Sequence, residues 1–315
     1  MKSEKHPQLL SSRLRVSVVV PTYDRSTELC DIIEQLLRQD YESAELIIID
    51  QTSQHDEKAI HYLKLVSSQI RYFNLSPPNV AAARNLGIRH STGDIIVFFD
   101  DDMMVPSDVL TRLVKSYDAP DIWGVTGFVL SPEEPHEHKY HSYRKLIGKL
   151  QVESKKHLLK TDSFIGGFMS FRKELFNRVG LFDEWIGIQP LGANEDLEFS
   201  RRASLRGYNL YLNTDLTVRH LASKQGGHNR FTMPIEVARY HQMRLSLYSY
   251  LKNRRYRGLV GWIDAFWLGY HSHILNREIL GNNLTALLKK HLVFARAFAA
   301  AIPMARHAKD RYEQS

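Results

Sequence analysis

The sequence predicts an α/β protein with a doubly wound, mostly parallel central sheet and a helical C-terminal extension. Over the first hundred residues, short apolar runs alternate with amphipathic segments of helical spacing, as in chains of strand–helix–strand units. Two of the apolar runs are followed at once by an aspartate, Asp50 and Asp100. Since the carboxyl ends of parallel strands share one edge of a sheet, we expect both aspartates to face one crevice.

The elements of this pattern follow a polar N-terminal tail, residues 1–14. The first strand is predicted at residues 15–21. An amphipathic helix then begins at Ser26 or Thr27, because apolar residues recur at helical spacing at Leu29, Ile32, Ile33, Leu36 and Leu37. The alternation continues with a strand at 46–49, a helix at 59–66, a strand at 70–75, a helix at Val80–His90 and a strand at Ile95–Phe99.

Composition places the chain among globular proteins. Its 315 residues, 43% of them apolar, suffice for one large α/β domain with an appendage. The single cysteine, Cys30, excludes an internal disulfide and a multi-cysteine zinc site, and we expect it in the core. The first apolar stretch, 16–20, is too short for a signal peptide, and no stretch reaches the roughly 18 uncharged apolar residues of a spanning helix. We therefore expect a cytoplasmic protein.

Charge is divided unevenly along the chain. Residues 220–315 hold 15 Lys or Arg against 5 Asp or Glu, net +10, whereas residues 1–219 hold 27 against 30, net −3. A nucleic-acid-binding domain would line its principal site with basic residues, so this division argues against a nucleic-acid partner. It favours an anionic surface that meets the basic tail.

Three consecutive carboxylates, Asp100, Asp101 and Asp102, follow the buried strand predicted at Ile95–Phe99. A hard cation such as Mg²⁺ or Mn²⁺ takes one or two carboxylates and leaves its other positions to phosphate and water. The three aspartates therefore suggest a metal–diphosphate site. The alternative is an acidic turn that leads into a helix beginning near Pro106 and Ser107. The residues by themselves leave both interpretations open.

No glycine-rich phosphate loop follows the first strand. Neither G-x-G-x-x-G nor G-x-x-x-x-G-K-[ST] is present there, which disfavours a dinucleotide dehydrogenase and a P-loop phosphotransferase. The turn reads Pro21-Thr22-Tyr23-Asp24-Arg25 instead. It offers an aromatic face, a carboxylate and a guanidinium, groups suited to a base and its ribose.

Seven segments together match a known family in order and spacing. They are residues 16–25, 46–50, 79–87, 99–102, 164–172, 179–184 and 194–202. These segments resemble the family 2 glycosyltransferases of the GT-A fold, over about residues 15–222. The resemblance implies a GT-A nucleotide-diphospho-sugar transferase domain at 15–222, followed by a basic helical region at 223–315. It also implies inverting transfer of a sugar from a nucleotide-sugar donor, in polysaccharide or glycolipid assembly.

The resemblance also implies roles for single residues. Asp102 and His220 would bind a divalent cation, Mn²⁺ or Mg²⁺. His220 follows a strand predicted at 216–218, where a histidine without the resemblance is an ordinary core or loop residue. The donor-binding residues would be Pro21, Thr22, Tyr23, Arg25, Asp50, Arg84, Asp100 and Asp101. A UDP-sugar is the default donor, GDP- and dTDP-sugars fit the same motifs, and the acceptor would be a carbohydrate or lipid-linked hydroxyl.

Glu195 and Asp196 are the candidate catalytic residues. They follow Asn194 at a predicted helix start, where the helix dipole favours ionised carboxylates. We therefore expect a base there to stay deprotonated. By resemblance Asp196 accepts the proton of the acceptor hydroxyl and Glu195 orients the acceptor. The alternative is that both are ordinary first-turn charges on a surface, and Arg84 likewise has a helix-surface alternative.

Two other functions remain in competition. A sugar-nucleotide pyrophosphorylase shares the α/β layout but requires a Gly-rich, Lys-containing loop after the first strand, which residues 21–25 do not provide. A non-catalytic nucleotide-sugar-binding protein of the same fold would not need both the aspartate triad and the Glu195–Asp196 pair.

The tail after Arg230 carries helical apolar spacing at residues 235–251 and 259–280, joined by a basic segment at 252–257. One interpretation is peripheral contact with an anionic membrane, because Lys and Arg beside aromatic residues suit the headgroup region. The other is a helical subdomain packed on the catalytic domain or on a second subunit. The glycine-rich segment 226–230 has the composition of a loop that closes over a diphosphate, or of an exposed linker.

Overall fold

The computed structural model describes residues 14–130, 151–155, 157–164, 166–188, 194–223, 226, 234–253 and 284–312. Within them a ten-stranded sheet has the order β3-β2-β1-β4-β9-β6-β10-β8-β7, and β5 pairs with β10. The strands are β1 Val16–Thr22, β2 Ala44–Asp50, β3 Arg71–Asn74, β4 Ile95–Phe99, β5 Met103–Met104, β6 Ile122–Leu130, β7 Gln151–Lys155, β8 Leu158–Thr161, β9 Phe168–Arg172 and β10 Asn209–His220. The helices are α1 Thr27–Leu37, α2 Glu57–Leu65, α3 Val80–His90, α4 Val109–Lys115, α6 Lys173–Val179, α7 Glu184–Ile188, α8 Glu195–Leu205, α9 Ile235–Asn253 and α11 Leu284–Tyr312.

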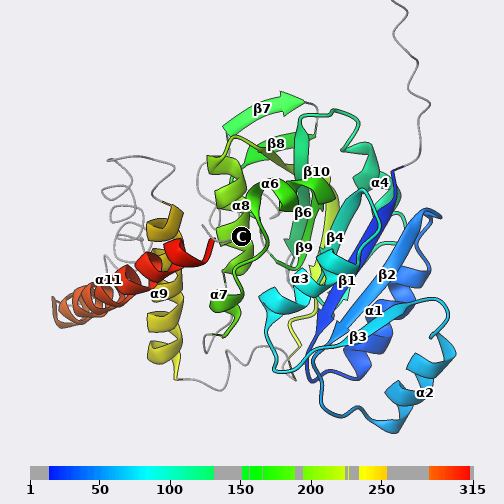
Figure 1. Cartoon of the computed structure of the whole chain (residues 1–315), viewed down its shortest axis with the longest axis horizontal. Helices are drawn as coiled ribbons and strands as arrows, with labels where there is room; N and C mark the ends of the chain where they lie inside the picture. The colour runs from blue at the N-terminus through cyan, green and yellow to red at the C-terminus, as the bar shows by residue number, and fades with distance from the viewer. Residues whose placement is uncertain are drawn as a thin grey trace, which may run out of the picture.

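The N-terminal half of the sheet is parallel, as predicted. Strands β3, β2, β1 and β4 run in one direction, with Thr22 beside Asp50 at the carboxyl edge. Beyond β4, strand β9 is antiparallel to both β4 and β6, whereas β6 and β10 are parallel. The predicted doubly wound α/β architecture is confirmed, and Figure 1 shows the helices packed on the twisted sheet.

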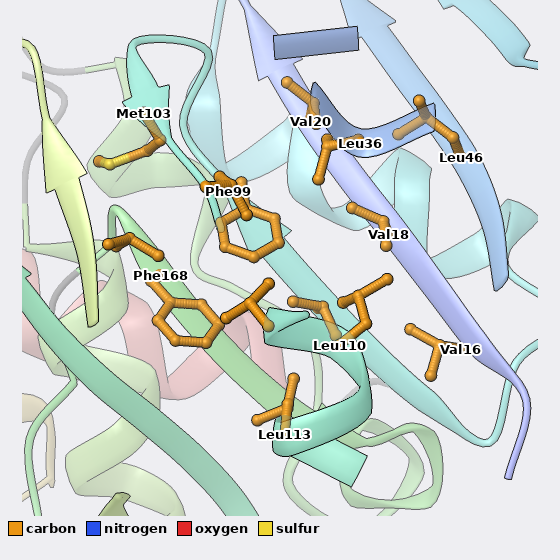
Figure 2. Close-up of a cluster of buried hydrophobic side chains, with 14 of the residues drawn as sticks. Val16, Val18, Val20, Leu36, Leu46, Phe99, Met103, Leu110, Leu113 and Phe168 are labelled. Carbon is orange, nitrogen blue, oxygen red and sulfur yellow. The ribbon is translucent and has the colours of Figure 1, made fainter. Parts of the chain in front are cut away.

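Strand β1 is buried along its whole length because both faces of the sheet are covered. Val16, Val18 and Val20 belong to one apolar cluster, under α1 and α4, and Figure 2 shows them with Leu36 and Phe99. Val19 faces the opposite cluster, which contains residues of α3, α6 and α8. The alternation of side chains along a strand thus places apolar residues in two cores, and an uninterrupted apolar run is the sequence pattern of such a strand.

Most predicted elements match the structure closely. Helix α3 and strand β4 have the predicted bounds, and the Asn79 side chain caps α3 by accepting a hydrogen bond from the amide of Ala82 at 3.0 Å. The first strand is shifted by one residue and α2 begins two residues earlier than expected. Cys30 on α1 is only half-buried, so its assignment to the core is wrong.

The described part of the C-terminal region is helical, as expected. Helices α9 and α11 share an apolar cluster with Ile186 of α7, and α9 also lies against α8. The predicted helix at 259–280 and the basic residues Arg254, Arg255 and Arg257 lie outside the described residues. No helix in the described part of the chain is long and apolar enough to cross a bilayer.

Candidate functional site

The turn after β1 and the aspartates after β4 meet at the carboxyl edge of the sheet. Asp101 is buried, and its Oδ2 accepts a hydrogen bond of 2.7 Å from the Thr22 hydroxyl. Its Oδ1 is paired with the guanidinium of Arg25. Burial raises the pKa of Asp101 to about 6, although Arg25 acts in the opposite direction. Asp101 therefore fixes the turn, and its direct contact with a donor stays a prediction.

Asp102 is the most deeply placed member of the triad. Its Oδ2 lies 3.1 Å from Nη2 of Arg25 and accepts a 3.2 Å hydrogen bond from the amide of Ser223. Its Oδ1 lies 3.1 Å from Nε2 of His220, in an orientation that makes no aligned hydrogen bond. Burial raises the pKa of Asp102, but His220 and Arg25 outweigh burial and bring it below its ordinary value. The pKa of His220 is raised, chiefly by Asp102.

These residues fit a divalent cation. The Oδ1 atom of Asp102 is buried without a hydrogen-bond partner in the described part of the chain, and the imidazole of His220 stands beside it. Strand β5 makes this meeting possible by pairing Met103 with His220, the last residue of β10. No group of three His, Cys, Asp or Glu side chains suited to a metal occurs among the described residues. A cation held by one or two carboxylates needs phosphate or water for its other positions.

Asp50 ends β2 and has no exposed surface. Its Oδ1 accepts a 2.7 Å hydrogen bond from the amide of Thr52, and its Oδ2 lies 2.5 Å from Nε2 of His55. The same Oδ2 accepts a hydrogen bond from the Tyr72 hydroxyl, and burial together with Asp50 raises the pKa of Tyr72. Sequence analysis missed His55 and Tyr72, because nothing in their local sequence marks them as partners of Asp50.

Three further predicted donor-binding residues, Pro21, Thr22 and Tyr23, lie where β1 ends. Pro21 and Thr22 are buried within β1, and Tyr23 is half-buried. Asp24 adopts a left-handed backbone conformation with φ 55°, and its amide donates to Thr52 Oγ1 at 2.9 Å. Gly226 packs so closely on this turn that a Cβ there would lie 2.2 Å from the carbonyl oxygen of Asp24. The rest of the predicted closing loop lies outside the described residues.

Arg84 is buried, with 2% of its side chain exposed, so its helix-surface alternative is wrong. Its Nη2 lies 3.1 Å from Oδ1 of Asp100, and its Nη1 is paired with Oε1 of Glu195. Burial lowers the pKa of Arg84, but Glu195 and Asp100 outweigh it and raise the pKa. One guanidinium thus joins the aspartate triad to the Glu195–Asp196 pair, which the sequence alone does not show.

Asp196 lies at the start of α8, as predicted, and both its oxygens accept backbone hydrogen bonds. The donors are the amide of Leu197 to Oδ1 at 2.7 Å and the amide of Gly166 to Oδ2 at 2.5 Å. A Cβ at Gly166 would lie 2.9 Å from Nη2 of Arg84 and 3.1 Å from Oδ2 of Asp196, so only glycine leaves this approach open.

The protonation of Asp196 differs from the expectation. Burial, reinforced by the charge of Glu195, raises the pKa of Asp196 to about 7. The helix start and Arg84 act in the opposite direction but do not outweigh burial. The prediction of a carboxylate that stays fully deprotonated is therefore wrong. A pKa near neutrality suits a group that must accept a proton and later release it.

Comparison with known proteins identifies the family. The family model described as glycosyl transferase family 2 matches residues 17–180. A curated relative, the GalNAc(5)-diNAcBac-PP-undecaprenol beta-1,3-glucosyltransferase of Campylobacter jejuni, is 28% identical over 55% of this chain and 56% of its own length. The chain spans less than two thirds of the length of the curated relatives that it matches first.

Solved structures share the fold. The mannosyltransferase PcManGT from Pyrobaculum calidifontis, in complex with GDP-Man and Mn²⁺, superposes with a TM-score of 0.59 at 19% identity, over 97% of this chain and 89% of that one. TarS 1–349 of S. aureus, in complex with UDP-GlcNAc, has a TM-score of 0.57 at 16% identity, over 96% and 92% of the two chains. At these identities the likeness establishes the GT-A fold.

Proposed function

The chain belongs to glycosyltransferase family 2, and on this premise we propose that it transfers a sugar from a nucleotide-diphosphate sugar to an acceptor hydroxyl with inversion. The observation that carries the proposal is the position of Arg84 between Asp100 and Glu195. An inverting transfer needs a group that supports the departing diphosphate and a base on the opposite face of the sugar. The triad and the Glu195–Asp196 pair supply these two functions within one site.

We assign the donor side to the carboxyl edge of β1, β2 and β4. Asp102 and His220 would hold the divalent cation, Mn²⁺ or Mg²⁺, and the bound cation would stabilise negative charge on the leaving diphosphate. The Mn²⁺ in the mannosyltransferase complex supports the use of a divalent cation. Pro21, Thr22, Tyr23, Arg25 and Asp50 would form the nucleotide side. UDP remains the default nucleotide, and GDP and dTDP are the alternatives.

We assign the acceptor side to α8. Asp196 accepts the proton of the attacking hydroxyl at Oδ2, while the Gly166 amide and the α8 backbone hold the carboxylate in place. Glu195, fixed through Arg84, orients the acceptor. The undecaprenol-linked substrate named for the Campylobacter jejuni relative supports a lipid-linked acceptor, and a carbohydrate acceptor is the alternative.

The test is a panel of UDP-, GDP- and dTDP-sugars, read by thermal shift with and without Mn²⁺ and followed by product analysis with water or a lipid-linked sugar as acceptor. A donor that binds the folded but not the unfolded protein raises the melting temperature, and at equal concentration a tighter donor raises it more. Release of a nucleoside diphosphate supports a transferase. Formation of a nucleoside triphosphate and a sugar 1-phosphate when pyrophosphate is added would indicate a pyrophosphorylase, and binding without turnover would indicate a binding protein.

The raised pKa of Asp196 predicts the pH dependence of transfer. The base works in its ionised form, so kcat/KM should rise with pH, bend near pH 7 and level off above it. Below the bend the slope should approach tenfold per pH unit. Donor affinity measured over the same pH range separates this effect from loss of the metal site. A kcat/KM that stays flat between pH 5.5 and 8 would contradict the assignment of Asp196.

For the C-terminal region we retain two alternatives, contact with an anionic membrane at the cytoplasmic face and a homodimer through the helices. Lys252 belongs to neither surface, because only 7% of its side chain is exposed. If the membrane alternative holds, replacing Arg254, Arg255 and Arg257 by Gln should release the protein from acidic vesicles, as should salt, which screens charges beyond about 8 Å. Co-sedimentation at low and high salt, beside light scattering, distinguishes the two. If the protein is a stable dimer and does not co-sediment with acidic vesicles at low salt, the membrane alternative is wrong.

A further inference from the structure

Four buried charged side chains form a cluster on and beside α8, the helix that begins with Glu195 and Asp196. It consists of Asp183, Glu198, Arg202 and Lys252, whose side chains are 5%, 0%, 2% and 7% exposed. Lys252 Nζ lies 2.7 Å from Asp183 Oδ2 and 3.0 Å from Glu198 Oε1. Arg202 Nη2 lies 3.0 Å from Glu198 Oε2. Among the described residues the cluster has two carboxylates and two cations and is formally neutral, so each charge depends on its partners for stabilisation.

The cluster joins three parts of the chain. Lys252 belongs to α9, Glu198 and Arg202 belong to α8, and Asp183 lies between α6 and α7. The hydroxyl of Tyr248 on α9 also donates to Asp183 Oδ2 at 2.5 Å. Arg202 donates to the carbonyls of Val179 and Leu181. Burial raises the pKa of Glu198, but Arg202 and Lys252 outweigh it and lower the pKa to about 2, so this carboxylate is charged at neutral pH.

From this cluster, contacts lead to the catalytic pair along two routes. Glu198 lies one helical turn after Glu195 on α8, so a shift of α8 moves both. On the other route, Asp183 is flanked by Phe182 and Glu184. The Asn85 side chain of α3 donates to the Phe182 carbonyl at 3.0 Å and to Glu184 Oε1 at 2.9 Å. Arg84, the neighbour of Asn85, pairs with Glu195. The cluster thus connects to Glu195 through α8 and to Arg84 through Asn85.

We propose that Lys252 is a positioning residue for transfer, which from α9 neutralises Asp183 and Glu198 and thereby holds α8 where Asp196 meets the acceptor hydroxyl. The proposal rests on the proposed function of Asp196. It makes α9 a support of the catalytic centre, and both α8 and α9 lie outside the segment matched by the family model, residues 17–180. Without Lys252 the other three side chains carry a net charge of −1, which movement of α8, entry of water or protonation of a carboxylate would relieve, and protonation too would weaken the remaining ion pairs.

The experiment compares Lys252→Met, Asp183→Asn and the double variant, which restores neutrality by removing one charge of each sign. Lys115→Met, an exposed lysine on α4, is the matched control. Hydrogen exchange is followed in peptides from α8 and, for reference, from α1. For Lys252→Met we expect exchange in α8 to rise roughly tenfold or more while α1 stays unchanged. We also expect kcat to fall roughly 10²-fold while donor affinity stays within about threefold, since displacement of a catalytic group impairs turnover rather than donor binding.

The double variant should recover most of the lost kcat and of the protection in α8. Unchanged exchange and kcat in Lys252→Met would overturn the proposal, as would equal losses of kcat and donor affinity, or a double variant no better than Lys252→Met. If Lys252→Met does not fold, Asp183→Asn takes its place. Faster exchange in α8 and a lower kcat would then support the proposal, and no change in either would overturn it. A wild-type protein without transferase activity would reject the proposed function, whereas the exchange of α8 would still report whether Lys252 holds that helix.

Discussion

Asp196→Asn is expected to fold, to bind donor with an affinity within about threefold of the wild type, and to lose transfer by roughly 10²-fold or more. The amide has the shape of the carboxylate, and its single oxygen can keep the hydrogen bond from the Gly166 amide but then loses the one from the Leu197 amide. It cannot take a proton from the acceptor hydroxyl. Because the pKa of Asp196 is raised to about 7, the substitution replaces a group that is already part-neutral at physiological pH. We therefore expect only the modest fall in melting temperature that the lost Leu197 hydrogen bond causes.

Donor affinity by calorimetry and kcat by release of nucleoside diphosphate give the two numbers, and Asp118→Asn, an exposed aspartate, is the matched control. The pH bend near 7 should also disappear from the residual activity. If Asp196→Asn turns over near the wild-type rate, another carboxylate is the base. Glu195 would be the first to examine, because its Oε2 is buried without a hydrogen-bond partner in the part of the chain that the structure describes.

Asp102→Ala is expected to abolish the part of donor binding that depends on the divalent cation. The substitution removes the buried Oδ1 that stands beside His220, together with the Oδ2 that meets Arg25 and the Ser223 amide. Loss of a group that merely orients a ligand typically lowers metal affinity 10- to 100-fold, so loss of a ligand should weaken donor binding with Mn²⁺ by roughly 10²-fold.

Calorimetry with UDP and GDP, with Mn²⁺ and with chelator, measures this directly and needs no turnover. Donor binding in chelator should hardly change, because Asp102 would not touch the nucleotide itself. The exposed Asp118→Ala is the control for loss of a carboxylate. Donor affinity that is unaltered in Mn²⁺ would remove Asp102 from the metal ligands and leave Asp100 and His220 to be tested.

The separate fates of Asp101 and Asp102 show why a motif does not fix roles residue by residue. Both aspartates pair with Arg25, but Asp101 also accepts from the Thr22 hydroxyl, whereas Asp102 lies beside His220. Lys252, in the C-terminal region, likewise has partners that its local sequence does not indicate. Its place in a basic segment of the sequence predicts an exposed charge, yet it is buried against two carboxylates.

By itself the sequence determined the elements and their order, such as the bounds of α3 and β4 and the convergence of Asp50 and Asp100 at one edge of the sheet. These follow from apolar periodicity, capping residues and strand direction, which act between near neighbours in the chain. Only the tertiary structure decided the partners of the charged groups. Arg84 meets Glu195 across 111 residues and Lys252 meets Asp183 across 69. The pKa of Asp196 was decided there too, because burial and the electrostatic interactions that set it arise only once distant segments have excluded water from one place.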